Sequence, residues 1–173
     1  MDAMKNMLTR TSVKKYKSDP VPKELIDQII EAGTHAASGL NKQSPIILAV
    51  TNTQVRDELS KLNMGKDPFH RADPFYGAPV VLVVLADKKV PTYLYDGSLV
   101  MAHLQLAAHA LGLGACWIHR AKETFEMPEG KALLEKLGIE GEYEGIGNCI
   151  VGYPDGELPA VKPRKENWVY YVD

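Results

Sequence analysis

Apolar residues recur along this chain at two spacings, one typical of helices and one typical of buried strands. Helical spacing predicts helices over residues 20–33, 53–62, 93–111 and 123–137, of which the last restarts at Pro128. Continuous apolar runs, typical of strands that are covered on both faces, predict strands over 45–50, 79–86, 115–118 and 146–153. The pattern therefore predicts an α/β (α+β) chain in which helices flank a largely buried sheet.

Two predicted segments have apolar residues that a single chain does not obviously cover. The predicted helix 93–111 is apolar almost all round, which is typical of a helix at the centre of a core or shared with a second chain. The tail 154–173 has three prolines and ends in an aromatic, β-prone stretch, 168–172, with no obvious strand of its own to pair with. We therefore expect the tail to cross onto a partner subunit.

Turn-forming residues mark the ends of several elements. Thr53 stands where the N-cap of the second predicted helix is expected. Glycines and prolines across 63–77 predict a loop of roughly 15 residues, and loops of that length are often functional lids.

The composition fits one ordinary globular domain, residues 1–173. Hydrophobic residues make up 45% of the chain and charged residues 24%, and a chain of this length buries roughly 70% of its surface without disulfides or metal ions. The formal net charge of −2 argues against nucleic-acid binding, which depends on a basic surface. The two cysteines have no metal-binding or redox spacing, and no apolar run approaches about 18 residues, so we expect a cytoplasmic protein outside the membrane.

Two basic segments carry the mixture of groups that binds an anion. Four basic residues fall within 10–17, where Arg10, Ser12 and Lys14 combine a guanidinium, a hydroxyl and an ammonium group. A second compact basic group spans 162–165. If the two segments meet in space, they would neutralise a phosphate. Each alone could equally be a solvated basic turn or tail.

A third segment, 36–45, places small residues and amides between a predicted helix and a predicted strand. Small side chains let a flat ring approach the backbone, and Asn41 and Gln43 could donate hydrogen bonds to ring carbonyls. The same residues also suit a plain helix end followed by a turn.

Other chemistry finds less support. Gly112 and Gly114 follow a helix and lack the third glycine of a dinucleotide-binding fingerprint. Cys116 and His119 are three positions apart on a predicted strand and so point to opposite faces, which argues against a Cys–His nucleophile. The five histidines include no pair suited to a metal ion on one helix face, and we expect no metal site.

Taken together, these segments resemble the nitroreductase family from end to end. The matching pieces, in order, are Arg10-x-Ser12-x-Lys14, Pro20-Val21-Pro22, Ala37-Ser38-x-x-Asn41-x-Gln43, the run from Gly112 to Ile118, and Gly152-Tyr153-Pro154 with Arg164. The resemblance implies a nitroreductase-like fold with a central mixed β-sheet and a homodimer that holds FMN between its subunits. It also implies that hydride passes from NADH or NADPH through flavin N5 to a nitroaromatic, quinone or similar small acceptor by a ping-pong mechanism.

The resemblance further implies which residues bind the cofactor. The residues expected to contact the phosphate and the ribityl chain are Arg10, Thr11, Ser12, Lys162 and Arg164. Lys14 would lie at the pyrimidine edge of the ring and stabilise negative charge there. The partner subunit would close the pocket with Ala37, Ser38, Gly39 and Asn41. The strand end Trp117, Ile118, His119 and Arg120 would face the ring, with looser contacts from Asn63 and Lys66, although Trp117 also suits the core.

The chain departs from the family pattern at several positions. Thr11 stands where a second arginine is usual, and Ala37 and Ser44 stand where prolines are frequent. His119 and Arg120 are bulky where relatives often have small residues, which leaves the acceptor open. The alternatives are a flavin-dependent reductase of an activated C=C or carbon–halogen bond, a non-catalytic flavin-binding protein, and a phosphate-binding module without flavin.

Overall fold

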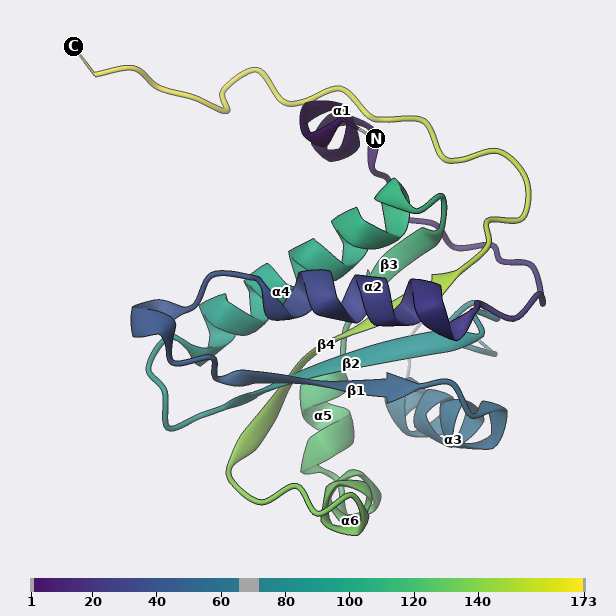
Figure 1. The fold of residues 1–173 in the computed structure, drawn as a ribbon, viewed down its shortest axis with the longest axis vertical. Helices are drawn as coiled ribbons and strands as arrows, with labels where there is room; N and C mark the ends of the chain where they lie inside the picture. The colour runs from purple at the N-terminus through teal and green to yellow at the C-terminus, as the bar shows by residue number, and fades with distance from the viewer. Residues whose placement is uncertain (1, 66–71, 173) are drawn as a thin grey trace.

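Helices cover both faces of a four-stranded sheet in the computed structural model, which describes residues 2–65 and 72–172 (Figure 1). The helices are α1 (Ala3–Thr9), α2 (Lys23–Thr34), α3 (Thr53–Met64), α4 (Tyr93–Ala110), α5 (Ala121–Glu126) and α6 (Pro128–Lys136), with a short 3-10 turn, η1, at Gly39–Asn41. The strands are β1 (Pro45–Val50), β2 (Val80–Asp87), β3 (Gly114–Ile118) and β4 (Tyr143–Gly152). The predicted α/β class is confirmed.

The sheet has the strand order β1-β2-β4-β3, and each ladder between neighbouring strands is antiparallel. The expected mixed sheet is wrong in this respect, because within residues 2–65 and 72–172 the parallel pairing is limited to an isolated bridge between Ser12 and Ala115. Apolar runs do not distinguish the two kinds of sheet when helices cover both faces. The central strand β2 is an example, since it is buried from Val80 to Ala86 although its neighbours run antiparallel to it.

The helices form two layers, with α2 and α4 on one face of the sheet and α3, α5 and α6 on the other (Figure 1). Alternate residues of β2 point to the two faces, so that Leu82 packs in one core cluster and Val83 in the other. Ile29 of α2 and Leu104 of α4 are fully buried in the first cluster, and Phe125 of α5 is buried in the second. Across the part of the chain that is described, no helix combines the length and apolar character that crossing a membrane requires.

Several element boundaries differ from the prediction for identifiable reasons. The sequence pattern does not predict α1, because this helix buries no residue of its own. Asn52, not Thr53, is the N-cap of α3, since its side chain accepts a hydrogen bond from the Val55 N–H. The strand β1 is half-buried rather than buried, because it lies at the edge of the sheet. The predicted loop 63–77 begins later than expected, since α3 continues to Met64, and its residues 66–71 lie outside the described residues.

Two segments far apart in the sequence lie along the same side of the molecule. After α1, the chain runs beside β3 and the end of β4. There the Val13 N–H donates to the Ala115 carbonyl at 3.0 Å and the Lys17 N–H donates to the Tyr153 carbonyl at 2.9 Å. The tail that follows β4 then passes beside α1 (Figure 1). These two crossings bring the two basic segments next to each other.

Candidate functional site

The first basic segment and the tail meet in a pocket of about 890 Å³ between α1 and residues 159–164, here called the cationic pocket. Its lining includes the residues that the sequence assigned to a phosphate, namely Arg10, Thr11, Ser12, Lys162 and Arg164, together with Lys14. The structure thus brings the two basic segments together. That they bind a phosphate stays a prediction.

No acidic side chain among the described residues neutralises the positive charge of the cationic pocket. Its lining has no acidic residue, and the ion pairs found among residues 2–65 and 72–172 involve none of its four cationic side chains. Arg164 donates from Nε and Nη2 to the Lys162 carbonyl, at 3.2 and 2.7 Å, and Arg10 reaches Gln105 Oε1 at 3.5 Å. Cations beside hydroxyl groups suit an anionic group such as a phosphate.

Helix α1 positions Arg10 by docking on the end of α4. Asn6 Nδ2 donates to the Leu106 carbonyl at 3.0 Å, and the Thr9 hydroxyl lies 2.9 Å from His109 Nε2. Burial lowers the pKa of His109, and the Arg10 guanidinium lowers it further. The ring is therefore neutral near pH 7 and adds no charge that would repel Arg10.

Lys14 lies beside an aromatic ring that the sequence did not associate with it. Its Nζ is 5.8 Å from the centroid of the Tyr76 ring, within the range of a cation–π contact. Tyr76 has a left-handed backbone, with φ of 54°, in the turn 72–77 that leads into β2. No local motif connects Lys14 with Tyr76, because they meet only through the packing of distant segments.

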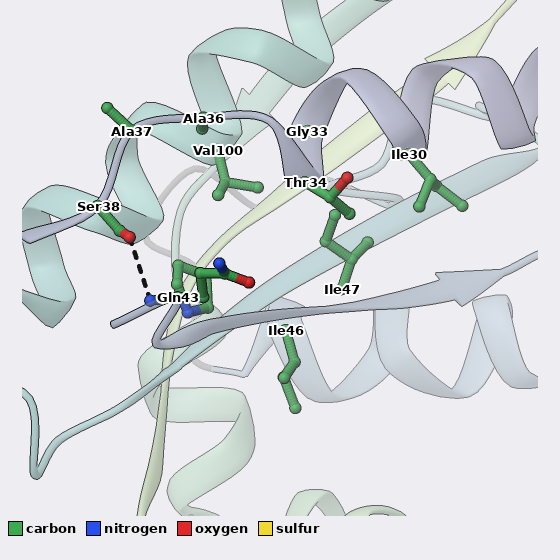
Figure 2. A pocket seen from close by; sticks show the side chains of 11 residues that line it. Ile30, Gly33, Thr34, Ala36, Ala37, Ser38, Gln43, Ile46, Ile47 and Val100 are labelled. Atoms are coloured by element: carbon green, nitrogen blue, oxygen red, sulfur yellow. Dashed lines mark hydrogen bonds between the residues drawn. The ribbon is translucent and has the colours of Figure 1, made fainter. Parts of the chain in front are cut away.

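The small-residue turn, residues 38–44, borders a second cavity of about 310 Å³, which lies among α2, β1 and α4 (Figure 2). Ala37, Ser38 and Gln43 line this cavity, and Ser38 Oγ accepts a hydrogen bond from the Gln43 N–H at 3.1 Å. Asn41 Oδ1 accepts a hydrogen bond from Gln43 Nε2 at 3.0 Å. This cavity shares no lining residue with the cationic pocket, so one chain alone does not place Ser38 and Arg10 in the same pocket.

The predicted strand end lies where β3 leads into α5, and Asn63 lies against it. Asn63 is 1% exposed near the end of α3 and donates from Nδ2 to the His119 carbonyl at 2.9 Å. The His119 side chain is exposed, whereas Ile118 is buried at the end of β3. Arg120 has a left-handed backbone, with φ of 76°, and its Nε is buried without a hydrogen-bond partner among the described residues. Asn63 therefore orients the strand end through the main chain.

Trp117 and Lys66 were also predicted to contact the cofactor. Trp117 is half-buried and packs against the core cluster on the α2 and α4 side of the sheet, which favours its interpretation as a core residue. Gly147 makes room for it, since a Cβ there would lie 2.5 Å from the indole Nε1. Lys66 lies outside the described residues.

Asp96 is a polar residue of this region that the sequence did not single out. Its carboxylate accepts hydrogen bonds from the Gly39 N–H and from the hydroxyl groups of Ser44 and Thr92. The available signal is that Asp96 is the one acidic residue in the mostly apolar segment 93–110. That signal does not indicate which turn the Asp96 carboxylate bonds to.

Known proteins share both the sequence pattern and the fold. The profile of the Nitroreductase family matches residues 7–68 and 65–153. A protein of Methanothermobacter thermautotrophicus that carries the name of an NADH dehydrogenase/NAD(P)H nitroreductase is 32% identical over 172 residues, which cover 90% of this chain and 85% of the relative. An FMN reductase (NAD(P)H) of Bacillus subtilis is 25% identical over 179 residues, covering 94% of this chain and 70% of the relative. The crystal structure of a nitroreductase with bound FMN from Bacteroides fragilis aligns over 100% of both chains, with a TM-score of 0.90 and 26% identity.

Proposed function

This chain belongs to the nitroreductase family, and from that premise we propose that it binds FMN in the cationic pocket and reduces a nitroaromatic, quinone or similar small acceptor. The electrons come from NADH or NADPH, as the names of the relatives from Methanothermobacter thermautotrophicus and Bacillus subtilis indicate for those proteins. The observation that carries the proposal is the convergence of Arg10, Ser12 and Arg164 on one pocket whose cations form no ion pair within residues 2–65 and 72–172.

The cationic pocket fits the phosphate of FMN by charge and by donor chemistry. A phosphate monoester carries about 1.5–2 negative charges at neutral pH, and the pocket opposes it with four cationic side chains. The guanidinium groups of Arg10 and Arg164 would bond its oxygens in pairs, and the Ser12 hydroxyl would add a further donor. Thr11 supplies a neutral hydroxyl where the family often has a second arginine, so the remaining cations carry more of the binding.

This chain contributes position and charge to the reaction. When bound, FMN supplies the atom that accepts and releases hydride, N5. Lys14 would stabilise the negative charge that reduction adds to the pyrimidine edge of the ring. The main-chain N–H groups at the end of β3 would face N5, and Asn63 fixes that strand end through its bond to the His119 carbonyl.

We also infer a homodimer in which each FMN lies between two subunits. In one chain the small-residue turn and the cationic pocket are separate, and a second copy could bring them together. Two apolar features support this arrangement. Leu40, at the tip of the turn, is 92% exposed, and Tyr171, in the tail, is 89% exposed. A partner subunit would cover both.

The visible spectrum of the purified protein tests the proposal. We expect the bands of bound FMN to bleach anaerobically on addition of NADH or NADPH and to return when a nitroaromatic or quinone is added. Parallel double-reciprocal plots for donor and acceptor would indicate the ping-pong mechanism. A colourless protein whose apo form binds no added FMN would overturn the proposal. If neither nucleotide bleaches the bound flavin, the protein binds flavin but is not a reductase that uses NADH or NADPH.

A further inference from the structure

A buried carboxylate holds the small-residue turn at both of its ends. Asp96 is 2% exposed in the first turn of α4. Its Oδ1 accepts a hydrogen bond from the Gly39 N–H at 3.0 Å, and its Oδ2 accepts hydrogen bonds from the hydroxyl groups of Ser44 and Thr92, each at 3.0 Å. Gly39 lies at the start of the turn, next to Ser38, and Ser44 ends the turn before β1. One side chain of α4 therefore fixes the turn where it starts and where it finishes.

The backbone between these two points adopts a conformation that most residues avoid. Leu40, Asn41 and Gln43 have positive φ angles of 50°, 53° and 48°. Left-handed residues of this kind persist only where the surrounding structure holds them in place. The side-chain bonds within the turn, which link Gln43 to Ser38 and to Asn41, are exposed to solvent. The bond from Ser44 to Asp96 is buried, so it anchors the turn to the core.

The turn also lies in direct contact with the start of α4. A Cβ at Gly39 would lie 2.4 Å from Thr92 Oγ1, a separation that real side chains do not reach. Only glycine lets the backbone come close enough for its N–H to reach the Asp96 carboxylate. Gly39 and Asp96 therefore act as a pair that sets the distance between the turn and α4.

We propose that Asp96 is a positioning residue of the flavin site. By bonding Gly39 and Ser44, it holds Ser38, Gly39 and Asn41 in the arrangement that FMN binding requires, without touching FMN itself. The inference rests on the proposed function, in which these residues close the FMN pocket of the partner. Without the carboxylate the turn relaxes, and FMN must reorder it on binding, which lowers the affinity.

Three variants test this role through the affinity of the apoprotein for FMN, measured by quenching of flavin fluorescence. We expect Asp96→Ala to weaken FMN binding about tenfold or more and Ser44→Ala to weaken it by a smaller factor, about threefold. Asp96→Asn should recover most of the affinity. Its amide oxygen still accepts from the Gly39 N–H, while the hydroxyl groups can rotate to accept from its NH₂ group.

Hydrogen exchange on the apoprotein gives a second readout that needs no flavin. Amides of residues 39–44 should exchange about tenfold faster in Asp96→Ala than in the wild type, while those of β2 stay protected. Asp27→Ala is the matched control, because it removes an aspartate whose ion pair with Lys23 is exposed on α2. This control should change neither the exchange of the turn nor the affinity for FMN.

The outcomes separate this inference from the function on which it rests. Wild-type apoprotein that binds no FMN would overturn both. FMN bound equally well by the wild type, Asp96→Ala and Ser44→Ala would overturn the inference alone. A lower melting temperature of Asp96→Ala, with exchange of the turn and FMN affinity unchanged, would assign Asp96 a purely structural role. If Asp96→Ala does not fold, Ser44→Ala decides by the same two measurements.

Discussion

If the cationic pocket binds FMN as proposed, single side chains determine which part of the cofactor it recognises. Arg164→Gln removes a positive charge and three of the five N–H donors from the wall of the pocket. We expect the dissociation constant for FMN to rise about 10- to 100-fold, since a hydrogen bond to a charged group contributes about 1.5–3 kcal/mol. The affinity for riboflavin, which has no phosphate, should stay the same. Fluorescence titration with the two flavins measures both affinities.

Lys165→Gln is the control for this prediction, because it removes the same charge at the next position. Lys165 does not line the pocket, and its ammonium group lies 5.4 Å from the centroid of the Trp168 ring. We expect its effect on FMN binding to be about twofold at most, because long-range charge is screened by salt. Equal losses in the two variants, or equal losses for FMN and riboflavin, would contradict a phosphate contact at Arg164.

Lys14 is expected to act on the redox properties of the bound flavin more than on its affinity. Lys14→Ala removes positive charge from the edge of the ring where reduction adds negative charge, so the midpoint potential should fall by about 30 mV or more, and oxidation of NAD(P)H should slow. Spectroelectrochemistry measures the potential. Lys15→Ala is the control, since Lys15 is exposed and pairs with Asp155. An unchanged potential in Lys14→Ala would remove this role.

Residue chemistry and the family resemblance were enough to predict the polar and charged residues that line the cationic pocket, but not its apolar lining or every contact near it. Arg10 and Arg164 could be assigned to one site because the family resemblance implies that both contact a phosphate, whereas charge alone also allowed a solvated turn and tail. The bond from Asn63 to the His119 carbonyl could not be predicted, since it depends on where the end of α3 meets the end of β3. The contact between Lys14 and Tyr76 could not be predicted for the same reason, because the two residues lie on distant segments of the chain.

Among the elements, the turn 72–77 depends on a partly buried ion pair for its attachment to α3. Asp73 pairs with Arg56, accepts a hydrogen bond from the Ser60 hydroxyl at 2.7 Å, and accepts two more from N–H groups of the turn at 2.9 and 2.7 Å. Burial alone would raise the pKa of Asp73. The bonds from Arg56, Ser60 and the two N–H groups outweigh burial, so the pKa lies below its usual value.

Asp73→Ala should lower the free energy of unfolding by about 2–3 kcal/mol at neutral pH, because Arg56 is left buried without this carboxylate. A carboxyl group whose pKa is lower in the folded state stabilises the fold above its unfolded pKa, about 3.9, and loses this effect as the pH falls through the folded pKa. The difference between wild type and variant should therefore hold between about pH 7 and pH 5 and shrink below about pH 4. Urea unfolding across this range measures it.

Asp57→Ala is the control for the ion pair between Asp73 and Arg56, because Asp57 also pairs with Arg56 but its side chain is 52% exposed. We expect it to change the free energy of unfolding by less than about 1 kcal/mol, as is typical of exposed pairs. A difference between wild type and Asp73→Ala that persists unchanged into acid would show that the lost stability does not come from the charged carboxylate.

Elements with a strong apolar pattern were predictable, and those held by single polar contacts were not. Helix α2 and strand β2 were predictable from the spacing of their apolar residues, because burial of those residues is what stabilises the two elements. Helix α1 buries nothing, and it depends on the Asp2 cap and on polar contacts to α4, for which the sequence has no periodic signal. The left-handed residues of η1 likewise follow from anchors outside the turn.

At the scale of the whole molecule, large apolar side chains are exposed on two helices and on the tail. They occur on α1 (Met4, Met7 and Leu8), on α4 (Leu94, Tyr95 and Leu99) and in the tail (Trp168, Val169, Tyr170, Tyr171 and Val172). Figure 1 shows the end of the tail extending away from the body of the chain. The aromatic composition of the tail predicts a partner subunit, but which surface the tail would cover depends on the geometry of two copies, which no local pattern specifies.

Removal of residues 165–173 tests whether this tail joins two subunits. The truncated chain keeps Lys162 and Arg164 in the cationic pocket but loses Trp168 and its neighbours, whose burial would contribute several kcal/mol to association. The dissociation constant of the dimer should rise at least about 100-fold in sedimentation equilibrium, and FMN affinity should fall with it, because the pocket then lacks the partner's small-residue turn. Trp168→Ser should shift both quantities in the same direction by less. A full-length protein that is monomeric with FMN bound, or a truncated one that dimerises and binds FMN as before, would show that one chain is enough to form the site.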